Sequence, residues 1–512
     1  MSKMSQAKYS MWIVGFEIKG DCKMKSQIVI GHLLLKSVNQ YPDKIAVIDG
    51  SREVTYKELL DKVTLAQHHL KHSVNADDTV MILLKNSIEF IIYYFALSML
   101  GVRVLPTYYD YTTDEIHRLY EHSSSVMIVT DNYYDKELTN LNICTLNIEE
   151  VNLINSSTDM KSLNYILNTS KIGVLLHTSG TSSQPKLVTH THQSIIENIK
   201  MHSESLGLTS EDRVLIAIPL AFGYCHTSQF LTHIYLGSTI TIMGGLFIPN
   251  YFVNLLNDHK ITITTLIPRM LNVLRERKAT LLKLNDSPLK KICYGGSPLS
   301  KNELSVLLSI LTNVDLIQTY GQTEAGPRIT YKVMQKQDHS HNVGIPISNK
   351  IKLKIIGDKS ENLPNGKIGK VFVQSPSLMK GYYQKEGLGT EGIIDGWLDT
   401  GDMGYLDQDN NLHLQGRISN MIKSLGFQFY PEEVETLLKS NFKEFNDILI
   451  TSEQHSKYGL IPVLYIEALE EDKELKRNIL KFCNDKLAHY KRPKKIYFVN
   501  KLERTLNGKI KR

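Results

Sequence analysis

A loop rich in hydroxyl groups is the first segment of this sequence that could do chemistry. It runs from His177 to Lys186 (HTSGTSSQPK) and directly follows the apolar, strand-like segment Ile172–Leu176. Hydroxyl and backbone N–H groups in a flexible loop can surround the oxygen atoms of a polyphosphate, and Lys186 adds a positive charge. The loop lacks the G-x-x-x-x-G-K-[ST] pattern of a Walker loop, so on its own a Ser/Thr-rich surface turn is an equally good explanation.

Three later segments bring aromatic, acidic and basic residues together. They are Thr319–Glu324 (TYGQTE), Trp397–Asp402 (WLDTGD) and Arg504–Lys509 (RTLNGK). Each has an ordinary explanation when it is taken alone: a strand-end turn with a surface glutamate, a turn that contains an aspartate, and a solvated basic tail. Their order along the chain, after the hydroxyl-rich loop, is what sets them apart.

Together the four segments resemble the motifs of the adenylate-forming superfamily, which contains acyl- and aryl-CoA synthetases, the adenylation domains of nonribosomal peptide synthetases, and luciferases. The loop matches [ST]-S-G-T-[ST]-G-x-P-K-G except at Ser183 and Leu187, where the family usually has glycine. A serine at position 183 lacks the backbone freedom that glycine has, and this would stiffen the loop. The other segments match Y-G-x-T-E, W-x-x-T-G-D and R-T-x-x-G-K. Shorter matches extend the resemblance over most of the chain, at Thr55–Tyr56, Tyr294–Leu299 and Gly369–Tyr383.

The resemblance implies a site for ATP and Mg²⁺. In the family the loop holds the β- and γ-phosphates, an aromatic ring stacks on adenine, an aspartate accepts both ribose hydroxyl groups, and an arginine contacts ribose and phosphate. The residues that the resemblance places at the nucleotide are Thr178, Ser179, Gly180, Thr181, Ser182, Gly295, Tyr320, Gly321, Asp402 and Arg417. Glu324 is implied as a ligand of the metal, since a hard cation prefers carboxylate oxygen. The implied catalytic residues are Lys509, Lys186 and Thr323.

The reaction that the resemblance implies is the activation of a carboxylic acid by ATP. The carboxylate attacks the α-phosphate to give an acyl-adenylate and pyrophosphate, and a thiol then attacks the adenylate. Lys509 would bridge the carboxylate and the α-phosphate, where negative charge grows. The sequence ends three residues after Lys509 without a fused carrier domain, so free CoA is the expected acceptor. Two alternatives stay open: the phosphopantetheine of a separate carrier protein, and a non-catalytic relative that only binds acyl groups or nucleotides.

The substrate acid is expected to lie against two segments, Pro219–His226 and Tyr294–Leu299. No acidic residue occurs between positions 213 and 257, and a buried ammonium group without a partner is costly, so an α-amino acid is disfavoured. An aryl or medium aliphatic carboxylic acid is the expected substrate. The residues expected to line the acyl pocket are Phe222, Tyr224, Gly296 and Ser297. Ordinary core packing is the alternative explanation for Tyr224 and for His226.

Apolar segments of two kinds alternate through most of the chain. Runs with strand character are separated by segments with a helical period, and this alternation predicts an α/β fold with a largely parallel sheet. The expected strands are Val80–Leu84, Val126–Val129, Ile172–Leu176, Val214–Ile218, Thr239–Met243 and Ile263–Ile267, and the expected helices include Leu59–Leu70, Ile88–Leu100 and Phe252–Asp258. After Gly366 a smaller β unit with Gly-rich turns is expected, with strands at 370–373 and 412–414.

A small α+β domain is expected at the end of the sequence. Pro431 opens a helix with acidic residues in its first turn, as the helix dipole favours, and strands at 448–451, 463–466 and 496–499 follow. The predicted class is therefore α/β, with an extension at 1–27, a large AMP-binding domain of layered α/β subdomains and a small β unit at 28–418, and a small mobile domain at 419–512 that carries Lys509. The family rotates this domain between its two steps. Ser419 stands at the hinge, where the family often has Asp and sometimes Lys, and Lys423 and Gly426 follow on the face that would approach the site for thiol transfer.

Composition and charge exclude several classes of protein. The 512 residues are 42% hydrophobic and 22% charged, which excludes a largely disordered or fibrous chain. The net charge is only +6, without a long basic block, so no extended nucleic-acid interface is expected. Five scattered cysteines without a C-x-x-C pair argue against a disulfide framework or structural zinc and favour the reducing cytoplasm. The longest apolar stretch, near Phe90–Leu105, is too short to span a bilayer. The N-terminal residues lack the features of a signal peptide, and Met24 is an alternative start of translation.

Overall fold

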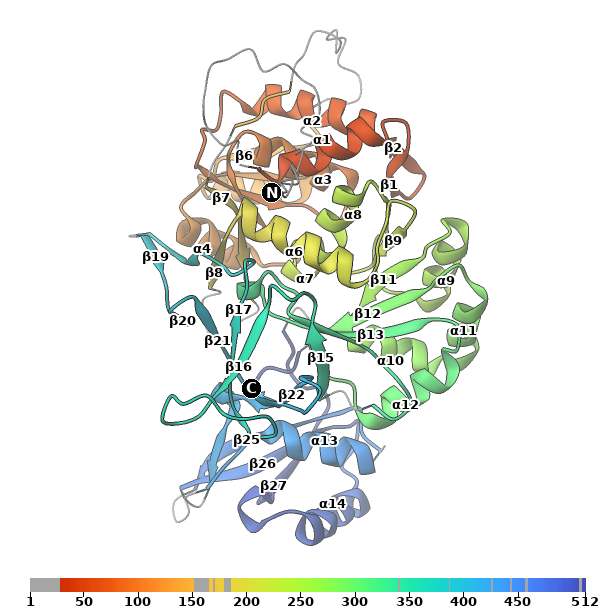
Figure 1. Ribbon diagram of the computed structural model, residues 1–512, viewed down its shortest axis with the longest axis vertical. Helices are drawn as coiled ribbons and strands as arrows, with labels where there is room; N and C mark the ends of the chain where they lie inside the picture. Colours follow the sequence, from red (N-terminus) through yellow and green to blue (C-terminus); the bar gives the residue numbers. More distant parts are fainter. Residues whose placement is uncertain are drawn as a thin grey trace, which may run out of the picture.

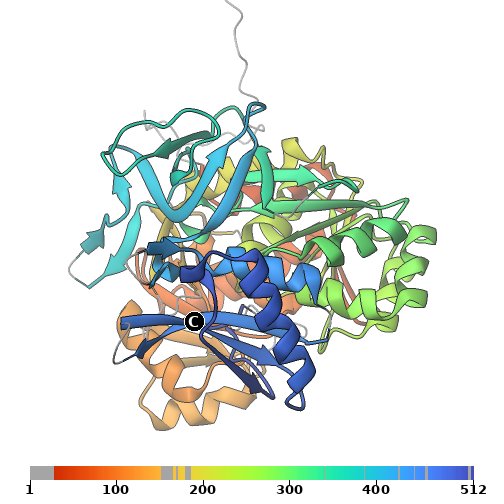
Figure 2. The same cartoon turned by 90° about the horizontal axis from the view of Figure 1, so that it is seen from below.

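The computed structural model describes residues 28–151, 165–168, 171–178, 186–338, 341–385, 387–424, 427–442, 444–455, 459–505 and 509–512. Two large sheets with their helices form most of the molecule, and the blue C-terminal unit lies at one end (Figures 1 and 2). The predicted class, a large α/β region followed by a small α+β unit, is confirmed. Within the described part of the chain, no helix combines the length and the apolar character needed to cross a membrane.

The first sheet has eight strands and a parallel centre. Strands β7, β4, β3, β5 and β6 run parallel in that order, while β8, β18 and β19 add an antiparallel edge. The bounds of these strands are β3 (Thr79–Leu83), β4 (Arg103–Pro106), β5 (Ser125–Thr130), β6 (Thr145–Asn147), β7 (Ile172–His177), β8 (Leu187–Thr191), β18 (Gly381–Gln384) and β19 (Gly387–Gly389). The hydroxyl-rich loop therefore connects two neighbouring antiparallel strands, β7 and β8.

The second sheet has 14 strands, of which six form the predicted parallel sheet. Strands β13, β12, β11, β9, β10 and β1 are parallel, and β14, β15, β22, β21, β17 and β16 continue the sheet with antiparallel pairs. The parallel strands are β1 (Ile45–Asp49), β9 (Arg213–Ile216), β10 (Thr239–Ile242), β11 (Ile263–Leu266), β12 (Lys291–Gly295) and β13 (Asp315–Tyr320). The antiparallel strands are β2 (Arg52–Thr55) beside β1, β14 (Thr330–Val333), β15 (Asn342–Pro346), β16 (Lys352–Ile356), β17 (Gly369–Gln374), β20 (Ile393–Ile394), β21 (Trp397–Leu406) and β22 (Leu412–Arg417).

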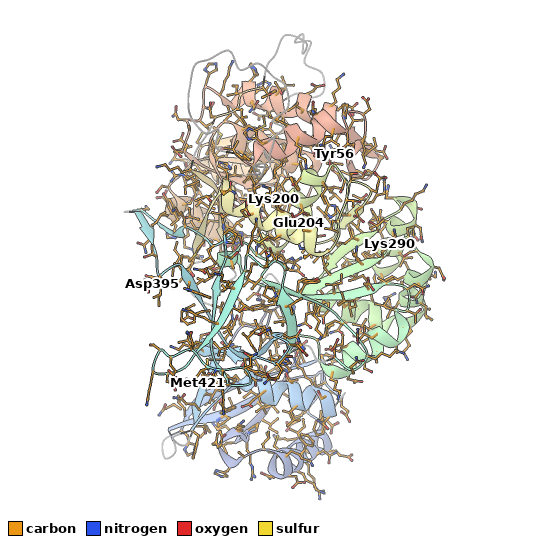
Figure 3. All side chains as sticks on the ribbon, viewed as in Figure 1. Tyr56, Lys200, Glu204, Lys290, Asp395 and Met421 are labelled. Atoms are coloured by element: carbon orange, nitrogen blue, oxygen red, sulfur yellow. The ribbon has the colours of Figure 1, made fainter. Side chains whose placement is uncertain are left out.

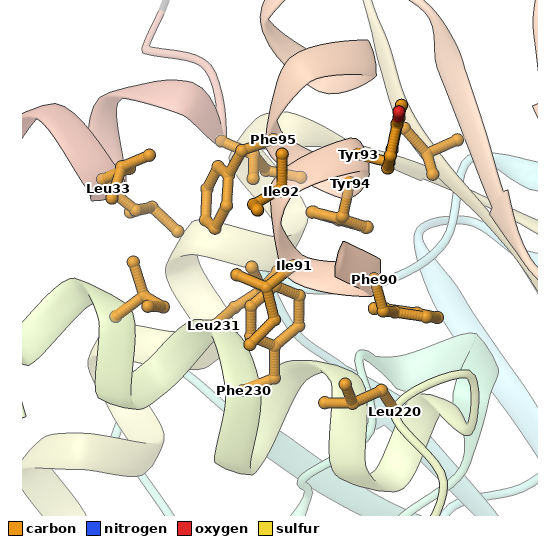
Figure 4. Packing of buried hydrophobic residues seen from close by; sticks show 14 of the residues in the cluster. Leu33, Phe90, Ile91, Ile92, Tyr93, Tyr94, Phe95, Leu220, Phe230 and Leu231 are labelled. Atoms are coloured by element: carbon orange, nitrogen blue, oxygen red, sulfur yellow. The ribbon is translucent and has the colours of Figure 1, made fainter. Parts of the chain in front are cut away.

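The main core lies between the two sheets. Every residue of helix α3 (Ile88–Met99) except Glu89 is buried, as expected of an apolar helix that is covered on all sides. Figure 4 shows how its rings meet Phe230 of the π-helical turn η2 (His226–Leu231). Phe230 contacts Phe90, Tyr94 and Phe95 edge to face, with ring centroids 6.4, 5.2 and 5.7 Å apart. Such contacts fix the helices between the sheets and hold the strand ends that carry the site.

Helices also cover the outer faces of both sheets. Apolar clusters join the first sheet to α4 (Thr113–Ser123) and α5 (Asn132–Asn140), and the second sheet to α9 (Pro249–Asp258), α10 (Pro268–Glu276) and α12 (Lys301–Ile310). The described layers are thus helix, sheet, helix, sheet and helix. Capping boxes fix where α2 (Tyr56–Leu70), α4 and α12 begin, because each N-cap hydroxyl group accepts from the backbone while a glutamate three residues later reaches back.

The C-terminal unit has its own core. Strands β25 (Asp447–His455), β26 (Gly459–Glu467) and β27 (Lys495–Val499) form a sheet that packs with α13 (Pro431–Asn441) and α14 (Lys473–Lys486). The chain enters this unit through the turn η5 (Ile418–Asn420) and the hairpin of β23 (Ile422–Ser424) and β24 (Phe427–Phe429). Met421 is labelled at this junction in Figure 3.

Candidate active site

Three residues expected at the nucleotide meet on neighbouring strands. Tyr320 ends β13, Asp402 lies within β21, and Arg417 ends β22 directly opposite Asp402. The Tyr320 hydroxyl donates a hydrogen bond of 2.6 Å to Asp402 Oδ2, and Arg417 Nε donates one of 3.1 Å to Oδ1. The carboxylate raises the pKa of Arg417, and burial together with the same carboxylate raises the pKa of Tyr320. The buried Asp402 side chain is thus fixed between a ring and a cation.

A glycine turn aims the Asp402 carboxylate. Gly401 has a φ of +69°, which glycine adopts without strain. The Gly401 N–H donates to Asp399 Oδ1, and the Thr400 hydroxyl donates to the Val371 carbonyl while it accepts from the Asp402 N–H. The hydroxyl group and the glycine of W-x-x-T-G-D therefore shape the turn that presents the aspartate.

The turn after β13, η4 (Thr323–Ala325), presents Glu324. Gly321 is required before it, because a Cβ there would lie 1.6 Å from the Pro327 carbonyl oxygen. Glu324 Oε1 accepts a hydrogen bond of 3.0 Å from the Tyr382 hydroxyl on β18. Since β18 belongs to the first sheet and η4 follows a strand of the second, this bond joins the two sheets at the candidate site.

The two ends of the hydroxyl-rich loop lie within the described residues. The Thr178 N–H donates to the Lys186 carbonyl at 3.0 Å, which closes the base of the loop. The Lys186 ammonium lies 4.5 Å from the centroid of the Tyr382 ring and 3.6 Å from Glu391. Because Tyr382 also contacts Glu324, the base of the loop lies beside the expected metal ligand. Outside the described residues lie Ser179, Gly180, Thr181, Ser182 and Ser183.

Lys509 reaches these residues from the C-terminal unit. A Cβ built on Gly296 would stand 3.9 Å from Lys509 Cε, with no other contact within 4 Å among the atoms that are described, so the lysine lies over the end of β12. Burial and the charge of Arg417 lower the pKa of Lys509 to about 8, while the charges of Asp402 and Glu324 act in the opposite direction. The lysine is therefore within electrostatic reach of all three groups.

Ion pairs hold the segment that carries Lys509. The Thr505 N–H donates to the Lys509 carbonyl at 2.6 Å, which makes a short hairpin. Before the hairpin Arg504 pairs with two carboxylates at 2.9 Å, and after it Arg512 pairs with a third at 2.6 Å. These carboxylates belong to Asp447, Glu467 and Glu435. Charge-assisted bonds on both sides tie the hairpin to the small sheet and to α13.

Of the residues expected at the acyl group, Tyr224 reaches the end of β12, and Phe222 packs on an aromatic ring of the first sheet's side of the molecule. Phe222 stacks on Tyr108 with ring centroids 5.2 Å apart, and Tyr224 Oη lies 3.0 Å from Thr319 Oγ1. A Cβ built on Gly295 would lie 2.9 Å from Tyr224 Oη, so this hydroxyl group covers the end of β12. Gly296 and Ser297, which follow Gly295, are exposed.

His226 lies in the core between the sheets. It is fully buried, and its Nε2 lies 2.8 Å from the Tyr94 hydroxyl. Burial lowers the pKa of His226 to about 3, so the imidazole is neutral at ordinary pH. Of the two explanations that the sequence left open for this residue, core packing describes its position.

The candidate hinge lies where the contacts of the chain change from one unit to the other. Arg417 bonds to Asp402 of the large sheet, whereas Asn420 Nδ2 donates a 2.5 Å bond to Glu432 Oε1 of α13. Ser419 lies between them in η5 and is exposed. The structure does not describe the Lys423 side chain or Gly426.

Sequence reasoning missed two residues beside the motifs. Tyr382 lies in the matched stretch that ends at Tyr383, but only the pairing of β18 with β8 brings it to Glu324 and Lys186. His190 is buried and its Nε2 donates a 2.7 Å bond to the Thr323 carbonyl, which supports the turn η4. A histidine within an apolar strand gives no signal for such a contact.

Comparison with known proteins covers almost the whole chain. A model of the family described as AMP-binding enzyme matches residues 34–383, and a model of the AMP-binding enzyme C-terminal domain matches residues 433–509. The chain is 28% identical over 484 residues to 2-succinylbenzoate–CoA ligase of Bacillus subtilis (strain 168), which covers 94% of this chain and 96% of that protein. It is 27% identical over 518 residues to 4-coumarate–CoA ligase 3 of Arabidopsis thaliana, which covers 96% and 91%.

Solved structures of CoA ligases also match this chain over most of its length. The structure of o-succinylbenzoate CoA synthetase from Bacillus subtilis in complex with its acyl-adenylate intermediate matches with a TM-score of 0.83 and 26% identity, over 94% of this chain and 96% of that one. The same enzyme in complex with ATP and a magnesium ion matches with a TM-score of 0.81, over 94% and 98%.

Proposed function

Because the chain belongs to the AMP-binding enzyme family, we propose that it is an AMP-forming acid–thiol ligase, which activates a carboxylic acid with ATP and transfers the acyl group to CoA. The position of Lys509 carries this proposal. Its side chain comes from the C-terminal unit and lies over Gly296, within electrostatic reach of Asp402, Arg417 and Glu324. Relatives that cover over nine-tenths of the chain and are named as acid–CoA ligases support the same chemistry.

In the first step a carboxylate oxygen attacks the α-phosphorus of ATP. The bond from that phosphorus to the bridging oxygen of the β-phosphate breaks, and pyrophosphate leaves. Negative charge grows around the α-phosphate, and the Lys509 ammonium stabilises this charge as a preorganised donor. Tyr320 stacks on adenine, and Asp402 accepts the ribose hydroxyl groups with the lone pairs that Tyr320 and Arg417 leave free.

Glu324 suits a magnesium ion that is shared with ATP. Mg²⁺ is usually bound by one or two carboxylates together with substrate phosphates and water. Glu324 supplies one carboxylate of this kind, at the turn η4. An ion held by Glu324 would neutralise phosphate charge, and the hydrogen bond from the Tyr382 hydroxyl fixes the Glu324 carboxylate.

The remaining phosphates belong to the loop between β7 and β8. We assign Lys186 to the β- and γ-phosphates, because its ammonium lies beside Tyr382 and therefore close to Glu324. Thr323 is assigned to the α-phosphate. The other residues assigned to the nucleotide are Thr178, Ser179, Gly180, Thr181, Ser182, Gly295 and Gly321.

In the second step the CoA thiol attacks the acyl carbon, and the bond from that carbon to the AMP oxygen breaks. We assign the mobile domain to residues 419–512 and its hinge to Ser419, since contacts pass from the large unit at Arg417 to the small unit at Asn420. A hinge residue needs only to absorb a change in backbone angles, and an exposed serine can do so. Rotation of this domain would withdraw Lys509 before the thiol arrives.

The expected substrate is an aryl or medium aliphatic acid that lies between Phe222, Tyr224, Gly296 and Ser297. The phosphopantetheine of a separate carrier protein is the alternative acceptor. We assign the protein to the cytoplasm, because five scattered cysteines without a C-x-x-C pair suit a reducing compartment.

A pyrophosphate-release screen tests the proposal. Purified protein is incubated with ATP, Mg²⁺ and a panel of carboxylic acids, with and without CoA, and thioester is measured by mass spectrometry. We expect release that depends on one class of acid and yields AMP and acyl-CoA. Thioester formed on a carrier protein but not on CoA would favour the alternative acceptor. No release with any acid would contradict the proposal and favour a protein that only binds its ligands.

A further inference from the structure

Arg328 is a fully buried cation in the loop that leads from η4 to β14, with 1% of its surface exposed. Its Nη1 donates a hydrogen bond of 2.6 Å to Thr319 Oγ1, and its Nη2 donates one of 2.9 Å to Ser228 Oγ. The guanidinium carbon lies 4.0 Å from the centroid of the Tyr224 ring. Nε has no hydrogen-bond partner among the described residues. The arginine is therefore held by neutral groups on three sides.

The two hydroxyl groups that accept from Arg328 cannot carry a negative charge toward it. The Thr319 hydroxyl donates its proton to the Tyr294 carbonyl at 3.0 Å, and the Ser228 hydroxyl donates to the Tyr224 carbonyl. Both are neutral acceptors whose own protons are already used. Within the described part of the chain, Arg328 forms no ion pair with an aspartate or a glutamate.

The titratable groups around Arg328 are also uncharged near neutral pH. The groups on which the charge of Arg328 acts are His202, Tyr224, Cys225 and Cys293. Burial, together with the charge of Arg328, keeps the pKa of His202 well below its ordinary value, and burial raises the pKa of the other three groups. Buried charges in proteins are normally paired, because an unpaired one loses its hydration without compensation. Arg328 thus lacks a counter-charge.

A line of contacts connects Arg328 to the reacting end of the site. Thr319 Oγ1 accepts from both Arg328 and the Tyr224 hydroxyl, and Tyr224 Oη lies against Gly295. The next residue is Gly296, over which Lys509 lies. An acid whose reacting carboxylate faces Lys509 would therefore have its body over the two glycines and its far end toward Tyr224 and Arg328.

We propose that the acid substrate supplies the missing counter-charge through a second anionic group, most simply a second carboxylate, which binds at Arg328. The Nε–H, which has no partner among the described residues, is a donor left for that group, and a charge-assisted bond to a carboxylate is among the strongest that an arginine makes. The inference rests on the proposed ligase function and narrows its substrate to acids with two negative charges. Arg328 would then decide specificity without taking part in bond making.

Matched pairs of acids test this inference. Each pair differs only by a second carboxylate, such as 3-phenylpropanoate and 3-(2-carboxyphenyl)propanoate, or hexanoate and adipate. Acid-dependent pyrophosphate release is measured for wild type, Arg328→Met and Arg328→Lys. We expect wild type to prefer the dianionic member by at least ~10-fold in kcat/KM, since a bond to a charged group has about that worth. Arg328→Met should lose this preference through KM for the acid while KM for ATP is unchanged, and Arg328→Lys should keep part of it.

Binding keeps the inference testable if no acid turns over. Dianionic acids should raise the melting temperature of wild type but not of Arg328→Met, by the ordinary linkage of binding to stability. Such a result without any pyrophosphate release would contradict the proposed ligase function and leave the role of Arg328 supported. Equal effects of Arg328→Met on both members of every pair would overturn the inference. Stabilisation of wild type but not of Arg328→Met by ATP·Mg²⁺ alone would also overturn it, because the counter-charge would then be a phosphate.

The unliganded protein gives a second measurement. Methionine nearly fills the space of arginine without its charge, and an unpaired buried charge costs folding free energy that an apolar side chain does not. We expect the melting temperature of ligand-free Arg328→Met to be no lower than that of wild type. Arg213→Met is the matched control, because Arg213 lies on β9 of the same sheet and donates to the carbonyl of His259 and to Thr239, so its loss should lower the melting temperature. A lower melting temperature in Arg328→Met combined with an unchanged preference between the acids would show a structural arginine and overturn the inference.

Discussion

The two ends of the proposed site treat charge differently. At the nucleotide end the Asp402 carboxylate lies between the Tyr320 hydroxyl and the Arg417 guanidinium, so the opposite charges are matched within the chain. At the acyl end Arg328 is buried more deeply, and the contacts described for it are two hydroxyl groups and a ring. Lys509, between the two ends, has a pKa lowered to about 8 because burial and Arg417 outweigh the nearby carboxylates.

Under the proposed function, the difference predicts which ligand group each end would accept. A carboxylate already paired with a cation suits neutral partners such as the hydroxyl groups of ribose, because no net charge is left over. A buried cation without a counter-charge suits an anion, since binding restores the pairing that the fold lacks. The matched end thus fits the part common to every nucleotide, and the unmatched end fits the part that distinguishes one acid from another.

The largest expected effect comes from removing the lysine between the two ends. Lys509→Ala should lose ~10²–10³-fold in acid-dependent pyrophosphate formation, the usual cost of one preorganised donor. Given presynthesised acyl-adenylate and thiol, the same variant should form thioester at nearly the wild-type rate. Lys511→Ala, an exposed lysine two residues further on, is the control and should change neither rate. Equal losses in both half-reactions, with unchanged thermal stability, would remove Lys509 from the adenylation step.

The matched end is tested by breaking its pairing. Asp402→Ala should weaken ATP binding by about 1.5–3 kcal/mol, roughly 10–100-fold in affinity, because ribose loses a charged acceptor. Calorimetric titration measures this. The melting temperature of the free protein should also fall, because the Tyr320 hydroxyl and Arg417 lose their partner, in contrast to Arg328→Met at the other end. Equal ATP affinity in variant and wild type would exclude Asp402 from the nucleotide site.

The lowered pKa of Lys509 predicts a pH dependence. The ammonium form is present below about pH 8 and is lost as the pH rises, so kcat/KM for pyrophosphate release should fall ~10-fold per unit above that value. Stability should respond in the opposite direction. The unfolded lysine keeps its proton to higher pH, so the contribution of this group to stability increases between about pH 8 and its ordinary pKa of 10.5.

A loss of activity above about pH 8 therefore cannot result from unfolding caused by the deprotonation of Lys509. The control is Lys509→Arg, whose guanidinium stays charged across the whole range. It should lower the rate but remove the limb near pH 8. A limb that stays at the same pH in Lys509→Arg would assign the titration to another group.

The smallest expected effect on ATP affinity comes from a change at the Tyr320 ring. Tyr320→Phe removes the hydrogen bond to Asp402 and keeps the flat face, so ATP affinity should fall by about 0.5–1.5 kcal/mol, a few-fold. Tyr405→Phe provides a comparison on the same sheet, where the ring stacks on His413 at 4.6 Å and no contact to Asp402 is described. A loss in Tyr320→Phe as large as that in Asp402→Ala would mean that the hydroxyl group itself contacts the nucleotide.

The matched end of the site was predictable from the sequence because short motifs encode it. The types and order of Tyr320, Asp402, Arg417 and Lys509 were enough to expect them together, and the turn at Gly401 shows why those types occur locally. The acyl end was predictable only in part. Arg328 follows the motif that contains Glu324, but its burial depends on Ser228 and Asn198, which lie 100 and 130 residues away in the sequence.

For the fold, too, short local patterns were predictable and contacts between distant segments were not. The expected strands were found with shifted ends because apolar runs mark them directly. The extension of the parallel sheet by antiparallel strands depends on pairings between distant segments, such as β15 with β22. Helix α6 (His192–Ser205) was not anticipated, because the face that it buries includes His192, Ser194, Asn198 and His202 in place of a regular apolar stripe.

The hairpin that carries Lys509 is fixed to the C-terminal domain, so the lysine moves only together with that domain. Arg504 and Arg512 fasten it to the small sheet and α13, so any displacement of that domain displaces the ammonium by the same rotation. A fluorescent label anywhere on the domain would then report where the lysine is. Leu469, 84% exposed on the domain, and Tyr133, 71% exposed on the first sheet's outer helix α5, offer a cysteine pair for energy-transfer measurements during turnover.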